Sequence, residues 1–244
     1  MIIYEQYLDL FNQCLGKNYT HTDKAGSYAF EIEGYTLHIW FQWSNGKIDW
    51  GNNFNFPKQA YNDTKLPWKV HGGFLRVFKS IVPFLKDSIL NSDIKNIKIV
   101  GYSHGAPLAA LCHEYCIYNR PDCNIEGYGF GSPRFLYGKY SDELLNRWKN
   151  FTVIKNPDDI VTWLPPWCSH VGQIVDLTPP GHFITEKMTV DPQILEEIKT
   201  FKIFKRSIKY ISIHIKTYFE KFIAGHRVIN IRQQLQNKIS SDII

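Results

Sequence analysis

Ser103 stands in a sequence context that can turn a serine hydroxyl into a nucleophile. It lies between Gly101 and Gly105 in the segment GYSHG, a G-x-S-x-G pattern. The preceding IKIV at 97–100 is largely β-branched and apolar, which predicts a buried strand, and apolar residues recur at helical spacing after the pattern. A strand, a sharp turn and a helix would lift the hydroxyl clear of both elements. We interpret Ser103 as a candidate for covalent catalysis; a chance turn before a core helix is the structural alternative.

The same turn supplies one donor for a developing oxyanion. The backbone N–H of His104 would lie at the N-terminus of the following helix, where partial positive charge favours an anion. A serine hydroxyl also needs a base, and that base usually needs an orienting carboxylate. Open α/β sheets carry such groups beyond the carboxyl ends of their strands. Asp158 and Asp159 follow a predicted strand at 151–154, although an Asn-Pro-Asp-Asp segment is also an ordinary turn or helix cap.

Two histidines downstream of the aspartates are candidates for the base. His182 lies in TPPGHF and His226 begins HRVINIRQQL. The remaining candidates, His71, His104 and His170, are interpreted as structural or pocket-lining side chains.

Predicted elements place these residues in an α/β fold. Helices are expected at 3–15, after residue 70, after residue 105 and at 141–148, and strands at 27–33, 35–41, 97–100, 125–130, 151–154 and 171–177. Residues 50–69 lack a clean period and are interpreted as loop or short helix. Strands that alternate with helices favour a mostly parallel central sheet flanked by helices. Over 1–244 we expect a single domain.

The composition and charge of the chain limit the classes of partner and ligand that we expect. A net charge of +5, much of it in one C-terminal stretch, argues against nucleic acid as the main partner. Five cysteines without a C-x-x-C pair argue against a disulfide framework or a zinc site, so no metal is expected. The N-terminus shows no signal peptide, which favours an intracellular, cytoplasmic location. Residues 201–224 predict a basic amphipathic helix that packs on the body or makes peripheral contact with an anionic membrane.

Four segments of the chain together resemble the class 3 (fungal-type) lipase family, which has the α/β-hydrolase fold. They are VHGGF at 70–74, GYSHGAPLAAL at 101–111, GFGSPRF at 129–135 and NPDDIVTWLPP at 156–166, and the resemblance runs from about Leu37 to Leu235. It implies a carboxylic ester hydrolase without a cofactor, acting on ester or lipid substrates. The leading hypothesis is therefore a triacylglycerol lipase-like enzyme with an acyl-enzyme mechanism, with phospholipid as another substrate for the same triad. A non-catalytic, α/β-hydrolase-like binding or membrane-associated protein is the alternative.

The resemblance also implies roles for individual residues. The family's acid directly precedes an Ile/Val pair, which here favours Asp159 over Asp158. Its base begins a final helix with apolar residues two and five positions on, which favours His226 and leaves His182 as second choice. The second oxyanion donor corresponds to Ser44, although Trp43 stands where the family commonly has glycine. Residues 53–69 occupy the place of the family's lid and are polar, so strong interfacial activation is not expected.

Overall fold

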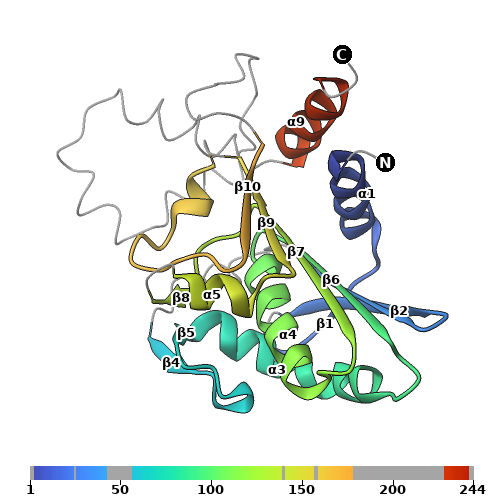
Figure 1. Ribbon diagram of the computed structural model, residues 1–244, viewed down its shortest axis with the longest axis vertical. Helices are drawn as coiled ribbons and strands as arrows, with labels where there is room; N and C mark the ends of the chain where they lie inside the picture. The colour runs from blue at the N-terminus through green and yellow to red at the C-terminus, as the bar shows by residue number, and fades with distance from the viewer. Residues whose placement is uncertain are drawn as a thin grey trace.

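A seven-stranded sheet lies at the centre of the computed structural model, which describes residues 3–24, 26–42, 57–138, 141–156, 159–177 and 228–241 (Figure 1). The strand order is β1-β2-β3-β6-β7-β9-β10. The first two pairs are antiparallel, and β3, β6, β7, β9 and β10 run parallel. The prediction of a mostly parallel, α/β-hydrolase-like sheet with flanking helices is confirmed.

The elements follow the predicted order closely. The strands are β1 (Thr20–His21), β2 (Ser27–Glu33), β3 (Thr36–Phe41), β4 (Lys58–Ala60), β5 (Lys69–His71), β6 (Asn96–Tyr102), β7 (Asn124–Phe130), β8 (Leu136–Tyr137), β9 (Phe151–Lys155) and β10 (Gln173–Asp176). The helices are α1 (Ile3–Gly16), α3 (Gly72–Leu90), α4 (Gly105–Asn119), α5 (Asp142–Arg147) and α9 (Val228–Ser241), with 3-10 turns η1 (Asn62–Thr64) and η2 (Ile160–Trp163). None of these helices is long and apolar enough to cross a membrane. The predicted helix at 201–224 lies outside the described residues.

The interpretation of residues 50–69 as loop or short helix is wrong in part. Within the described portion, β4 and β5 form strands of a second sheet with the order β4-β5-β8. Val70 of β5 pairs with Leu136 of β8, which is 66 positions further along the chain. Each strand is only two or three residues long, so no local alternation of apolar and polar residues signals it, and the pairing partner is distant in sequence.

Helices cover the central sheet on two faces. One cluster of buried side chains joins α3 and α4 to the sheet, and it includes Ile97 and Ile99 of β6. The other joins α1 and α9 to the opposite face, and it includes Val100 and Tyr102 of the same strand. The division follows from the alternation of side chains along a strand. In Figure 1, α1 and α9 lie side by side, and residues of the two helices are in contact.

Helix α4 carries polar side chains deep into the core. Its residues 105–116 are all buried, including His113 and Glu114. The Glu114 carboxylate accepts hydrogen bonds from Arg147 of α5, with Arg147 Nε at 3.0 Å, so the buried charge is paired. His113 packs edge-on against Phe151, at 5.4 Å between ring centroids. Burial lowers the pKa of His113 to about 3, although the backbone groups of Ile125 and Asn150 act in the opposite direction.

This buried histidine predicts a loss of stability in weak acid. The ordinary histidine pKa is about 6.5, so below that pH the unfolded chain takes up a proton that native His113 does not, and the native state loses stability as the pH falls. Between pH 7 and pH 5 the loss from His113 is about 2 kcal/mol. Urea unfolding at the two pH values, compared between wild type and His113→Leu, measures it. The prediction fails if the variant loses as much stability on acidification as the wild type.

Candidate active site

Ser103 occupies the turn between β6 and α4 in a left-handed backbone conformation, with a φ of 54°. This conformation costs a non-glycine residue roughly 1–2 kcal/mol, so the surroundings must hold it. The Ser103 N–H donates to the Phe130 carbonyl at the end of β7, at 2.9 Å, and the Ser103 carbonyl accepts from the Ala106 N–H at 3.0 Å. The side chain is half-buried. The predicted nucleophile therefore sits in the sharp strand-to-helix turn that the sequence pattern indicated.

Two glycines allow the turn to close. A Cβ on Gly101 would collide with the backbone of Gly105 and Ala106, and a Cβ on Gly105 would collide with the carbonyl oxygens of Phe41 and Gln42. The chain that leaves β3 therefore passes directly against the N-terminus of α4. Ser44, the predicted second oxyanion donor, follows this segment but lies outside the described residues.

His104, whose backbone amide is the predicted oxyanion donor, lies at the start of α4 with its side chain buried. It is the N-cap of α4, where helix geometry leaves the first amide groups without intrahelical partners. Its ring is buried against Phe74, with 5.4 Å between centroids, and Phe74 in turn contacts the His71 ring at 4.6 Å. Burial, and then the nearby His71, lower the pKa of His104 to about 4. The imidazole is therefore neutral at pH 7.

Asp159 is fully buried beyond the carboxyl end of β9, at the N-cap of η2. Its Oδ1 accepts from the Val161 N–H at 2.9 Å, and its carbonyl accepts from the Thr162 hydroxyl at 2.8 Å. Strand β9 pairs with β7, and β7 pairs with β6, which leads to Ser103. The two predicted site residues therefore stand at the same edge of the sheet, with one strand between theirs. The cap role foreseen for this segment is also present. Asp158 lies outside the described residues.

Tyr102 and His170 lie close to the turn that carries Asp159, the acid turn, and the proximity of Tyr102 was not predicted. Tyr102, the residue before Ser103 in the sequence, is buried. Its burial and, to a lesser extent, the charge of Asp159 raise the pKa of its phenol. The His170 ring, predicted to be structural or pocket-lining, is buried with its Nε2 at 2.8 Å from the Thr162 carbonyl. The turn that carries Asp159 is thus braced by a histidine from beyond η2, a contact that only the fold creates.

Helix α9 contributes to a buried cluster that includes the ends of the central strands. Both candidate bases, His182 and His226, lie outside the described residues. The helix begins at Val228, two positions after His226. Its buried residues Ile231 and Leu235 belong to one cluster with side chains at the ends of the three central strands; these are Tyr102, Phe130 and Ile154.

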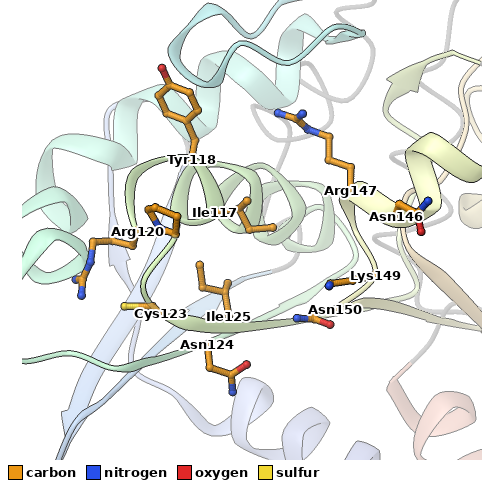
Figure 2. A pocket seen from close by; sticks show the side chains of 11 residues that line it. Ile117, Tyr118, Arg120, Cys123, Asn124, Ile125, Asn146, Arg147, Lys149 and Asn150 are labelled. Carbon is orange, nitrogen blue, oxygen red and sulfur yellow. The ribbon is translucent and has the colours of Figure 1, made fainter.

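A cavity of about 620 Å³ lies at the amino ends of β7 and β9, and Figure 2 shows the side chains that line it. It is formed by the end of α4 and the segments that lead into β7 and β9. Its two arginines are already engaged: Arg120 with Asp122 and with backbone carbonyls, and Arg147 with Glu114. This cavity is remote from Ser103 and Asp159, which stand at the carboxyl ends of the strands.

Comparison with known proteins places the chain in a family. The model of the family described as Lipase (class 3) matches residues 38–169, more than half of the chain. Similar solved structures, each 21% identical, include a fungal lipase-inhibitor complex (62% of this chain and 60% of that chain, TM-score 0.52) and a triacylglycerol lipase whose catalytic centre is a serine protease triad (67% and 66%, 0.56). The Rhizomucor miehei triacylglyceride lipase is a third (67% and 66%, TM-score 0.53). The chain therefore spans less than two thirds of the length of these lipases. No curated protein matches it.

Proposed function

The chain belongs to the class 3 lipase family, and from that premise we propose that it is a serine carboxylester hydrolase acting on acylglycerols or related lipid esters. The observation that carries the proposal is the backbone of Ser103, held in the left-handed region between β6 and the N-terminus of α4. This conformation of a half-buried serine lowers the stability of the protein, and strained backbone conformations of this kind are frequent at catalytic sites. The turn also brings the amides of the α4 N-terminus next to the hydroxyl.

In the proposed reaction Ser103 attacks the ester carbonyl while a histidine takes its proton. The tetrahedral oxyanion is stabilised by backbone N–H groups, of which His104 supplies one and Ser44 the other. The histidine then gives its proton to the leaving alcohol, and the acyl group remains on Ser103. Water, deprotonated by the same histidine, attacks the acyl-enzyme; the acid is released as the histidine returns the proton to the Ser103 oxygen. Asp159 orients the imidazole and stabilises its charged form.

We assign the base to His226. Helix α9 shares one buried cluster with Tyr102 and Ile154, which supports this choice, because Tyr102 directly precedes Ser103 and Ile154 lies near the end of β9, before Asp159. A base at residue 226 is separated from Val228, the first residue of that helix, by a single position. His182 remains the second choice, because no described element lies as close to it in the sequence.

Hydrolysis of p-nitrophenyl esters across a range of acyl lengths tests the assignment. We expect His226→Ala to lower kcat by roughly 10⁴-fold or more and His182→Ala to leave it within a fewfold of the wild type. The preferred acyl length separates an esterase from a lipase. If His182→Ala is the inactive variant, the base assignment is wrong while the enzyme class stands.

A further inference from the structure

Two cationic side chains lie against one indole beside the acid turn. Arg134 lies in the loop after β7, Lys155 ends β9, and Trp163 ends η2, four positions after Asp159. The guanidinium carbon of Arg134 is 5.1 Å from the centroid of the Trp163 ring, and Lys155 Nζ is 5.0 Å from the same ring. The backbone N–H of Arg134 donates to the Leu164 carbonyl at 2.8 Å, which fixes this loop to the acid turn. We call these three residues the cationic cluster.

Among the residues that the structure describes, the positive charge of the cationic cluster exceeds the negative charge near it. Lys155 Nζ is paired with Asp176 Oδ1 at 3.3 Å. For Arg134, no carboxylate of the described residues lies within 4.0 Å of its guanidinium. Burial lowers the pKa of Arg134, and arginine nevertheless keeps its charge in proteins. Within the described residues, two cations thus share one carboxylate, and the Trp163 that they contact is 47% exposed.

The buried side chain of His170, next to the cluster, adds no negative charge that would offset Arg134 and Lys155. His170 is 5% exposed, and burial lowers its pKa to about 3, with the charges of Lys155 and Arg134 acting in the same direction. The imidazole is therefore neutral. Its Nδ1 is buried and has no hydrogen-bond partner among the residues that the structure describes. Counting the described residues, the surroundings of the cluster are thus electropositive and partly buried, and they are open to solvent on the side of Trp163.

We propose that Arg134 and Lys155, held against Trp163, bind an anionic group of the ester substrate, a phosphate or a carboxylate. The inference rests on the proposed function, because it names the substrate class of the same site. A guanidinium stacked on an aromatic ring keeps its N–H donors in its own plane, where they can bind two oxygens of such a group at once. Partial burial strengthens the attraction, because a lower dielectric weakens charge screening.

The position of the cluster relative to the nucleophile fits this role. Its loop begins directly after Phe130, whose carbonyl binds the Ser103 N–H, and its indole ends the turn that Asp159 caps. An ester held at Ser103 would therefore meet the cations on the side of β7 and β9. Substrates with a charged group and an ester in one molecule, such as a phospholipid or a half-ester of a dicarboxylic acid, match this arrangement.

Binding of inorganic phosphate tests the subsite without any turnover. Calorimetric titration of Ser103→Ala protein is compared with the double variants that add Arg134→Gln or Lys17→Gln. Lys17 is the matched control, because its Nζ lies 3.9 Å from the Trp40 ring and 2.7 Å from Glu31, a similar cation, indole and carboxylate on a different part of the protein. We expect Arg134→Gln to raise the Kd for phosphate at least about tenfold, as the loss of a charge-assisted hydrogen bond implies, and Lys17→Gln to leave it unchanged. Absent binding, or equal binding in all three proteins, would overturn the proposal.

Turnover then identifies the source of the anion. The ratio of kcat/KM for dihexanoylphosphatidylglycerol to that for dihexanoylglycerol is measured in active wild type, Arg134→Gln and Lys17→Gln. A ratio that falls about tenfold in Arg134→Gln alone supports a lipid phosphate. An unchanged ratio, with phosphate inhibiting hydrolysis of p-nitrophenyl butyrate in wild type but not in Arg134→Gln, supports a water-soluble anionic ester.

Equal losses of kcat/KM on both lipids, with unchanged phosphate affinity, would show that Arg134 only stabilises the loop and would overturn the proposal. Arg134-dependent phosphate binding without any ester turnover would contradict the proposed function and keep the anion site.

Discussion

Replacing Ser103 with alanine is expected to lower kcat for p-nitrophenyl esters by roughly 10⁴-fold or more, because the change removes the hydroxyl that we propose forms the acyl-enzyme. The change removes one oxygen and keeps the Cβ, so the hydrogen bonds of the Ser103 backbone to Phe130 and Ala106 are retained. Stability should therefore stay within about 1 kcal/mol of the wild type. Initial rates and urea unfolding of the same preparation measure both quantities.

Ser80→Ala is the matched control for this experiment. Ser80 lies on α3, and its hydroxyl donates a hydrogen bond to the Val77 carbonyl at 2.7 Å. This position is away from the elbow, the turn at Ser103 between β6 and α4. The control should keep its activity. A Ser103→Ala protein that hydrolyses esters at the rate of this control would contradict the assignment of the nucleophile.

The second large effect concerns the folding of the elbow. Gly105→Ala is expected to lower the free energy of unfolding by at least about 3 kcal/mol, or to prevent folding, because the added Cβ would collide with the carbonyl oxygens of Phe41 and Gln42. Both contacts are with backbone atoms, which cannot move aside as a side chain can. Urea unfolding followed by circular dichroism measures the change.

Gly16→Ala provides the comparison. Gly16 ends α1, and a Cβ built there meets no atom within 4 Å. Alanine has the higher helix propensity, so this variant should be as stable as the wild type or slightly more stable. Equal stability of the two variants would show that β3 does not approach α4 as closely as described.

The elbow was predictable because its signals are local. The β-branched run, the two glycines and the apolar helix all lie within about twenty residues, and the strand-turn-helix they indicate is present as β6 and α4. The same holds for α5, where Ser141 accepts a hydrogen bond from the Leu144 N–H at 3.3 Å, as an N-cap does. In these segments the local pattern and the tertiary environment favour the same structure.

The remaining features depend on contacts between distant segments. The strand β5 pairs with β4 on one side and with β8 on the other, and nothing within three residues of Val70 indicates either partner. Likewise, Tyr102 and His170 come close to the acid turn through the pairing of the strands and the path of the chain beyond η2. The convergence of Arg134 and Lys155 on Trp163 has the same origin, because each comes from a separate loop or strand.

Covalent labelling by a fluorophosphonate probe, with the modified residue located by peptide mass spectrometry, tests the central claim most directly. The probe reacts with serines that an adjacent base activates, whatever the natural ester is. We predict a single adduct on Ser103 in the wild type and none in Ser103→Ala. Folded wild-type protein that takes up no probe, or that carries the adduct on another residue, would contradict the account; the first result would favour a non-catalytic binding protein.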